Sequence, residues 1–302
     1  MNKLYVLVGL PASGKSTYAK EKLKSEETIV LSSDELRKEL LGNESDQTNN
    51  EIVFRTLYAR AREYLQNGKN VVIDATNINI KARRGLLSNF AKMPIERIAI
   101  VFAAPFEICI ERDKSRERTV GEEVIKKFLY RFEIPMEYEG FDKIVIENRQ
   151  EGYISKDMLN IFYEFDQKNP HHKYTVGDHC HKCYLEVISR INGDDDLIFA
   201  STIHDIGKCY TQTFDESGIA HYYSHHNVGA YICMCDNGLS RTSIFYVNFH
   251  MNPFFWKEQK THDKYKKLFG DKLYNNLILL NACDKIASGT KEQNNDTNNG
   301  QN

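Results

Sequence analysis

The hydrophobic residues of the first half fall into short runs that alternate with amphipathic stretches. Such runs are typical of strands buried on both faces of a sheet. The stretches between them have helical periodicity, at about 16–23, after residue 33, and at 51–67, where Gly68 ends the helix. Strands alternating with helices predict a parallel sheet with helices on both faces. The expected strands lie at 4–8, 28–32, 70–77, 95–104 and 140–148.

The pattern changes near residues 150–155. From about residue 154 it is helical, is richer in His and Cys, and shows no repeating strand. We therefore expect an α/β domain over 1–150 followed by an all-α domain over 155–289. The final stretch, 290–302, is polar and Asn-rich and lacks apolar anchors, so we predict that it is disordered.

Composition narrows the class of protein only a little. The chain has 302 residues, 41% of them hydrophobic, and its 40 basic and 42 acidic side chains nearly balance. The seven cysteines in a chain of this length favour reduced thiols and a cytoplasmic location. No apolar run reaches the roughly 18 residues of a membrane span, so we expect no membrane contact. The first apolar run resembles a signal peptide only faintly, because it stops at Pro11 and continues into a glycine-rich loop.

The first expected strand is followed by a sequence with the spacing G-x-x-x-x-G-K-[ST], GLPASGKS. This spacing lets successive backbone N–H groups converge on phosphate oxygens, next to the positive end of a helix. Lys15 would reach the β- and γ-phosphates of ATP, and Ser16 would hold Mg²⁺. We predict that the nucleotide is bound by Gly9, Ser13, Gly14, Lys15, Ser16 and Thr17.

Two acidic residues follow the next strands of the expected sheet. Asp34 comes after the second strand and Asp74 ends the third. The carboxyl ends of parallel strands gather at one rim, where ligands bind. Asp34 could therefore take a proton from an attacking hydroxyl, and Asp74 could serve the magnesium ion or the acceptor. Arg37 lies one helical turn after Asp34. The alternative for Asp34 is a helix N-cap.

Three arginines lie close together after the fourth strand, in the stretch ERDKSRERTV. Arg112, Arg116 and Arg118 could form a lid over a triphosphate, because the charge that develops on a moving phosphoryl group is stabilised by cations. The alternative is a solvated helix face on which Glu111, Asp113 and Glu117 pair with them.

Taken in order, GLPASGKST, SSDELR, VVIDATN and RDKSRERTVGEEVIKKFLYRFEIP resemble the phage-type polynucleotide kinases, over about residues 3–148. The resemblance implies phosphorylation of 5′-hydroxyl ends of RNA or DNA. It makes Asp34 the general base, Arg37 a contact to an acceptor phosphate, Asp74 the essential acid and Arg116 the lid arginine. The family often has Arg just before the base, where this chain has Ser33. Related small-molecule and tRNA-nucleoside kinases share the same core.

All ten histidines fall after residue 170, and several recur with aspartates. Imidazole together with carboxylate suits divalent Mn, Fe, Co or Zn rather than a soft thiolate site. An ion held in this way activates water and screens the charge of a phosphoester. The candidate ligands are His179, His204, Asp205, His225, His250 and Asp284.

The series YTVGDH, HDIGK, HYYSHHNVGA and ACDKIA is similar to the HD-domain phosphohydrolases, over about residues 165–290. The resemblance implies that His179, His204, Asp205 and Asp284 are the core metal ligands. It places His225 and His250 at a second metal or at the substrate phosphate, and His221 is a weaker candidate. By the same resemblance, Lys208 contacts phosphate.

Two other interpretations apply to parts of this half. The sequence His179-Cys180-His181-x-Cys183 could be half of a structural zinc site, but no second ligand pair has the same spacing. An aromatic cluster near His250 could stack on bases, although a buried core is the better interpretation. It comprises Phe245, Tyr246, Phe249, Phe254, Phe255 and Trp256.

Together the two halves predict a bifunctional enzyme that heals nucleic-acid ends, as in RNA repair. An ATP- and Mg²⁺-dependent 5′-hydroxyl kinase would be joined to a 3′-phosphatase or 2′,3′-cyclic phosphate hydrolase that uses Mn²⁺ or another transition metal. The expected partners are RNA or DNA ends with 5′-hydroxyl and 3′-phosphate groups, and a nucleic-acid ligase. The alternatives are a metabolite or nucleoside kinase fused to a nucleotidase, and a kinase regulated by a nucleotide-sensing HD module. The sequence does not indicate an oligomeric state.

Overall fold

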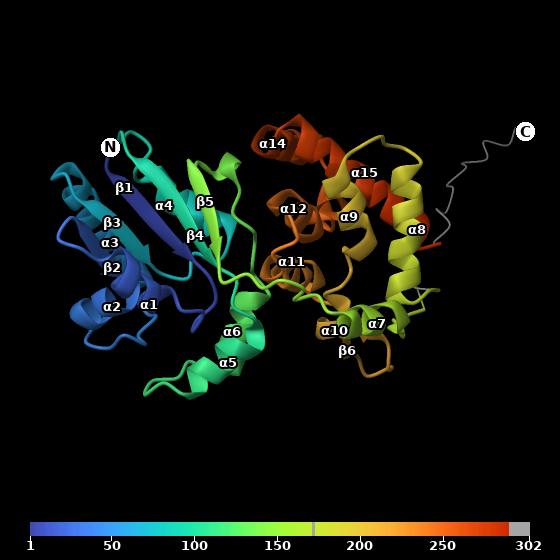
Figure 1. Cartoon of the computed structure of the whole chain (residues 1–302), viewed down its shortest axis with the longest axis horizontal. Helices are drawn as coiled ribbons and strands as arrows, with labels where there is room; N and C mark the ends of the chain where they lie inside the picture. Colours follow the sequence, from blue (N-terminus) through green and yellow to red (C-terminus); the bar gives the residue numbers. More distant parts are fainter. Residues whose placement is uncertain (171–172, 290–302) are drawn as a thin grey trace, which may run out of the picture.

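The computed structural model describes residues 1–170 and 173–289, and it consists of two halves that lie side by side (Figure 1). The first half contains a sheet with helices, and the second half is built from helices. The tail that the sequence predicts to be disordered, 290–302, lies outside the described residues.

The sheet of the first half has five strands in the order β2-β3-β1-β4-β5, and all neighbouring strands are parallel. This confirms the predicted parallel α/β architecture. The central strand β1 carries the glycine-rich loop at its carboxyl end, so the loop lies in the middle of the ligand-binding rim. The strands are β1 (Lys3–Val8), β2 (Thr28–Ser32), β3 (Asn70–Asp74), β4 (Glu96–Phe102) and β5 (Lys143–Glu147).

Side chains alternate between the two faces of the sheet. Val6 and Val8 belong to a large core on one face, whereas Leu7 packs on the other face with Ala19. The helix expected over 16–23 is a four-residue α-helix followed by a π-helical turn. The helices of this half are α1 (Lys15–Tyr18), η1 (Ala19–Leu23), α2 (Ser33–Leu41), α3 (Asn50–Gln66), α4 (Ile80–Ser88), α5 (Phe106–Lys114), α6 (Glu122–Leu129) and η2 (Glu137–Glu139).

The second half is helical apart from one short antiparallel hairpin, β6 (Thr213–Phe214) with β7 (Ala220–His221). Among the described residues, no helix is both long and apolar enough to cross a membrane. The helices are α7 (Lys156–Glu164), α8 (Val176–Ile188), α9 (Asp195–Ile203), α10 (Lys208–Thr211), α11 (His225–Cys235), α12 (Arg241–Phe249), α13 (Asn252–Phe255), α14 (Gln259–Phe269) and α15 (Asp271–Ala287).

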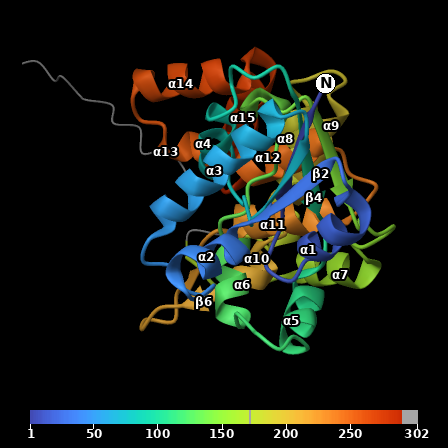
Figure 2. The same cartoon turned by 90° about the vertical axis from the view of Figure 1, so that its left-hand side faces the viewer.

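The two halves share one continuous hydrophobic core and specific hydrogen bonds. The buried Asn248 amide accepts from the backbone N–H of Ile134 at 2.7 Å and donates to the Phe132 carbonyl at 3.1 Å. Tyr231 donates its hydroxyl to the Ala104 carbonyl at 2.6 Å. Turned by 90°, the structure shows α5, α6, α7 and α10 at the same end of the molecule (Figure 2). The halves are therefore packed against each other rather than joined only by a linker.

Candidate active sites

The glycine-rich loop after β1 is closed by its own lysine. Gly14 has φ +100°, a left-handed conformation that a residue with a side chain adopts only with strain. Lys15 is buried, and its ammonium donates to the carbonyls of Gly9 at 3.0 Å and Leu10 at 2.6 Å. Burial lowers the pKa of Lys15 to about 8, although Asp74 opposes the shift. In the presence of a bound triphosphate, the ammonium of Lys15 would donate to phosphate oxygens in place of these carbonyls.

A cavity of about 210 Å³ lies in front of this loop. Its lining includes residues from the loop, from the ends of β2 and β3, and from the arginine-rich segment after α5. Most of the predicted kinase residues meet there. Gly14, Lys15, Ser16, Thr17, Asp34, Asp74, Arg116 and Arg118 line the cavity. Gly9 and Ser13 belong to the loop as well, but they are buried and do not line the cavity.

Asp34 is not the cap of its helix. The N-cap of α2 is Ser32, whose hydroxyl accepts from the N–H groups of Asp34 and Glu35 at 3.3 Å each. This excludes the alternative that Asp34 is the helix N-cap, because the helix already begins at Ser33. The carboxylate of Asp34 is 57% exposed toward the cavity and is free of a capping role.

Arg37 has a different contact from the one that the resemblance implies. It is buried, and its guanidinium donates to Asp34 at 2.6 Å and to Asn50 at 3.1 Å. It is not part of the cavity lining. These contacts hold the Arg37 guanidinium against the Asp34 carboxylate.

Asp74 lies beside Ser32 where β2 and β3 end. Burial raises the pKa of Asp74, while a hydrogen bond from Ser16 and the charge of Lys15 act in the opposite direction. Ser16 and Asp74 together could offer oxygen ligands, the type that Mg²⁺ prefers in such sites.

Arg112 lies in the last turn of α5, and Arg116 and Arg118 lie in the segment that follows it. The buried Asp113 carboxylate accepts from the N–H groups of Val120 and Gly121, so it shapes this segment and is not a surface partner of the arginines. Arg118 pairs with Glu44 at 3.0 Å and approaches Asp34 at 3.9 Å. Arg112 does not line the cavity, but its guanidinium lies 3.8 Å from the place where a Gly14 Cβ would stand. Arg116, Arg118 and Val120 of this segment line the cavity.

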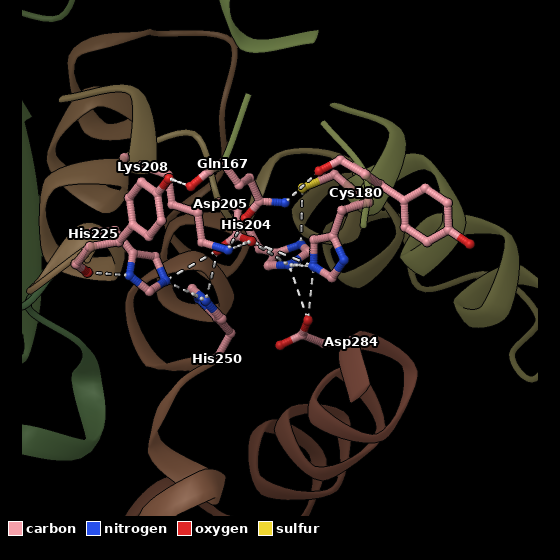
Figure 3. Close-up of polar contacts among 12 residues, drawn as sticks. Gln167, Cys180, His204, Asp205, Lys208, His225, His250 and Asp284 are labelled. Atoms are coloured by element: carbon pink, nitrogen blue, oxygen red, sulfur yellow. Dashed lines mark hydrogen bonds and ion pairs between the residues drawn. The ribbon is translucent and has the colours of Figure 1, made fainter. Parts of the chain in front are cut away.

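The second cluster gathers histidines and aspartates in the interior of the helical half (Figure 3). In the first group, His179 Nε2 lies 3.3 Å from His204 Nε2 and 2.9 Å from Asp284 Oδ1. Asp205 Oδ2 lies 3.5 Å from the same His179 nitrogen. These residues come from α8, the end of α9 and α15, so sequence-distant ligands converge on one place.

The second group uses the other oxygen of Asp205. Oδ1 lies 3.1 Å from His225 Nε2 and 3.5 Å from His250 Nε2, and the two imidazole nitrogens are 3.3 Å apart. Both groups have ligand atoms close enough to hold a metal ion. Figure 3 shows Asp205 between His204 on one side and His225 and His250 on the other. One carboxylate is thus shared by two potential metal positions.

The far ring nitrogens of the histidines face backbone carbonyls. Nδ1 of His225 lies 2.8 Å from the Tyr222 carbonyl, and Nδ1 of His250 lies 2.8 Å from the Val247 carbonyl. Nδ1 of His204 lies 3.2 Å from the Ser201 carbonyl. A neutral ring with its proton on Nδ1 would donate to the carbonyl and present the Nε2 lone pair inward, as is usual for metal-bound histidines.

The carboxylates of this cluster are ionised despite their burial. Burial opposes charge, but Lys208 and the neighbouring histidines hold the pKa of Asp205 well below its usual range. His179 and His204 lower the pKa of Asp284 in the same way. Ionised carboxylates and available imidazole lone pairs fit a divalent transition metal.

Lys208 is held inside the cluster by two polar side chains. Its buried ammonium lies 2.7 Å from Asp205 Oδ2 and donates to Gln167 at 2.9 Å. Gln167 has no sequence signal of its own, and only the fold brings it here. Gly207 permits a close approach of chain segments, because a Cβ at this position would lie 1.9 Å from the His225 carbonyl oxygen. In the sequence, Gly207 is marked only by its position within the HDIGK motif.

The other sequence interpretations fare differently. Within residues 1–170 and 173–289, neither group of side chains that could hold a metal contains a cysteine. His181 is also exposed. Both observations argue against the zinc half-site. His221 pairs with Asp215 at 3.0 Å outside both groups. Four residues of the aromatic cluster near His250 are buried, as the core interpretation expects: Phe245, Tyr246, Phe249 and Trp256. Phe255 of the same cluster is exposed.

Known proteins resemble the first half of the chain. Residues 4–135 match the family model described as an AAA domain. The L-seryl-tRNA(Sec) kinase of Methanococcus maripaludis is 29% identical over 143 residues, which cover 44% of this chain and 53% of that protein. The chain therefore spans about half the length of this curated relative.

Solved structures also align with parts of the chain. A chain in the structure of the Pnkp1/Rnl/Hen1 RNA repair complex is 25% identical, with a TM-score of 0.39 and coverage of 42% of both chains. The APS kinase CysC of Mycobacterium tuberculosis, solved with AMPPNP and APS, is 18% identical, with a TM-score of 0.36 and coverage of 53% of this chain and 96% of that chain. The family match covers residues 4–135, which include the glycine-rich loop, and the curated relative is a kinase.

Proposed function

We propose that the chain is a bifunctional phosphotransferase and phosphohydrolase that acts on the two ends of a broken nucleic-acid strand. The observation that carries the proposal is the presence of two separate, chemically different centres in one chain. One is an oxygen-lined cavity beside a phosphate-binding loop, and the other is a histidine–aspartate cluster.

In the first centre, the 5′-hydroxyl oxygen of the acceptor attacks the γ-phosphorus of ATP as the bond to the β-phosphate oxygen breaks. Asp34, oriented by Arg37, accepts the hydroxyl proton. Lys15, Arg116 and Arg118 face the phosphates and stabilise the charge that moves onto the leaving oxygen. Ser16 and Asp74 would hold Mg²⁺ with the nucleotide.

In the second centre, water attacks the phosphorus of a 3′-phosphate, and the bond to the 3′-oxygen breaks. His179, His204, Asp205 and Asp284 would hold one divalent metal, and His225 and His250 a second that shares Asp205. A metal bound in this way supplies a hydroxide nucleophile near neutral pH. Lys208 holds Asp205 in place and offers a buried cation next to the phosphate.

The test is to incubate the full chain with ATP, magnesium, manganese and an RNA oligonucleotide that has a 5′-hydroxyl and a 3′-phosphate. Tandem mass spectrometry must locate the phosphate, because gain at one end and loss at the other leave the intact mass unchanged. We expect a product with a 5′-phosphate and a 3′-hydroxyl. A strand unchanged at both ends would contradict the proposal. Hydrolysis of free nucleotides alone would support the nucleotidase alternative.

A second acceptor is favoured by one specific observation, the similarity to a kinase whose name specifies seryl-tRNA. That acceptor would be a serine hydroxyl carried on RNA instead of a ribose 5′-hydroxyl. Offering seryl-tRNA and the uncharged oligonucleotide in parallel separates the two. Transfer of phosphate to seryl-tRNA alone would replace the polynucleotide acceptor.

A further inference from the structure

A second cavity, of about 360 Å³, lies between the two halves of the molecule and belongs to neither centre. Its walls come from α5 and α6 of the first half, from the connecting segment and α7, and from α10 and α11 of the second half. In both views α5, α6, α7 and α10 lie in the lower part of the molecule, and α11 lies nearer its middle (Figures 1 and 2). The cavity therefore exists only because the two halves are docked.

Aromatic side chains dominate the walls. The five aromatic residues come from five different segments, and Tyr210 is 45% exposed, so one large ring remains open to a ligand. Tyr231 is buried, and its hydroxyl is fixed to the Ala104 carbonyl. A rigid aromatic pocket of this size lies at the small end of ligand pockets, which span roughly 300–1,000 Å³. The aromatic lining consists of Phe106, Tyr130, Tyr153, Tyr210 and Tyr231.

Charged groups at the cavity limit what can occupy it. Glu107 and Glu122 are exposed at its edge and offer hydrogen-bond acceptors, while Lys126 lies over the Tyr130 ring at 5.8 Å. An aliphatic ligand would gain nothing from the carboxylates. A flat heteroaromatic ring with N–H donors at its edge could stack on tyrosine and donate to them.

The same helix lines both this cavity and the ATP cavity. Val124 and Phe128 of α6 face the phosphate-binding loop, whereas Glu122, Lys126 and Leu129 face the cavity between the halves. On the other wall, Tyr210 lies two residues after Lys208, and α11 begins at the ligand His225. An occupant would thus touch elements of both proposed centres.

We propose that this cavity binds a single nucleobase, with Tyr210 as its stacking surface and Glu107 and Glu122 as acceptors for its amino and ring N–H groups. The base can come from a free nucleoside or from a strand held by the enzyme. Only the strand-bound form rests on the proposed function. Bases with an exocyclic amino group bind better than uracil, because uracil offers a single N–H donor.

The test uses nucleosides, because without phosphates they are not retained by the phosphate-binding loop. Equilibrium dialysis of the full chain with labelled adenosine, guanosine, cytidine and uridine should show saturable binding, weakest for uridine. Tyr210→Ala should weaken it about tenfold, the effect of losing one stacked base. Tyr64→Ala, a tyrosine exposed on α3, is the matched control and should bind as the unaltered protein does. Absence of saturable binding, or equal binding by Tyr210→Ala, would overturn the proposal.

The source of the base is distinguished with oligonucleotides that carry 2-aminopurine at one position at a time. If the 2-aminopurine fluorescence is quenched at one position only, and the quenching is lost in Tyr210→Ala, the occupant is a base of a bound strand. Nucleoside binding with no quenched position indicates a free nucleoside. Both results support the pocket. Asp34→Asn and Asp205→Asn should bind nucleosides normally, so failure of the proposed activities is separable from failure of the pocket.

Discussion

The centre at the glycine-rich loop takes its loop from eight consecutive residues, whereas the histidine–aspartate centre takes its side chains from segments spread over about a hundred residues. In the first, the backbone of one loop and the lysine that follows it provide the main geometry. In the second, α8, α9, α11, α12 and α15 must all be packed correctly before the imidazole nitrogens approach one another. The second centre therefore depends far more than the first on packing between residues that are distant in sequence.

The largest expected effect tests the metal. His204→Ala removes an imidazole whose Nε2 faces His179 and Asp284. We expect elemental analysis to show at least a tenfold loss of bound transition metal, together with loss of any stimulation of phosphohydrolase activity by manganese. His181→Ala, on the exposed side of α8, is the control and should keep both. Equal metal content in the His204 variant and the unaltered protein would remove the metal assignment.

A smaller effect tests the dependence on packing. Gly207→Ala places a methyl group 1.9 Å from the His225 carbonyl oxygen and 2.6 Å from the Gly229 nitrogen, so α10 and α11 must separate. We expect a loss of at least about 2 kcal/mol in the free energy of unfolding. Gly85→Ala has open space around it on α4 and should instead stabilise by about 0.5–1 kcal/mol. Urea unfolding of both variants measures this, and a neutral Gly207→Ala would contradict the close approach.

The contact between the halves gives the next prediction. Asn248→Ala removes the bonds to the Ile134 N–H and the Phe132 carbonyl and leaves both buried. The expected destabilisation is about 1–3 kcal/mol, the penalty for an unpaired buried polar group. The exposed Asn67 serves as the control residue. If the thermal unfolding of Asn248→Ala matches that of Asn67→Ala, the hydrogen bonds of Asn248 between the two halves do not stabilise the protein.

The smallest effect concerns pH. Burial lowers the pKa of Lys15 to about 8 in the free protein. Bound phosphate favours the charged form of this lysine. ATP affinity should therefore be flat below pH 7 and should fall above about pH 8, by at most tenfold per pH unit. Titration calorimetry from pH 6 to 9 measures this. Lys15→Arg keeps its charge throughout, so any residual affinity in that variant should lack the decline.

The difference between the centres also explains what the sequence could predict. The strands and the loop follow from local apolar runs and the GKS spacing, and the structure has both. The cap at Ser32 could not be chosen from the sequence, because Ser32, Ser33 and Asp34 are three polar residues in a row that offer equivalent hydroxyl and carboxyl caps.

In the second centre, the sequence shows the histidines and aspartates only as a recurring series. The carbonyls that orient their rings, the approach of Gln167 to Lys208 and the anchoring of Asn248 were not. These contacts join residues far apart in sequence, and no local pattern records them. The burial of Arg37 against Asp34 and Asn50 was hidden for the same reason, because it depends on how α2 packs against α3.

The measurement that tests the central claim most directly compares two isosteric variants on one substrate. Asp34→Asn and Asp205→Asn each replace a carboxylate by an amide of the same shape, one in each centre. On an RNA with a 5′-hydroxyl and a 3′-phosphate, Asp34→Asn should slow 5′-phosphorylation by about 10²-fold or more and leave 3′-dephosphorylation unchanged. Asp205→Asn should abolish 3′-dephosphorylation and leave 5′-phosphorylation intact. Loss of both activities in either cooperatively folded variant would contradict the account of two independent centres.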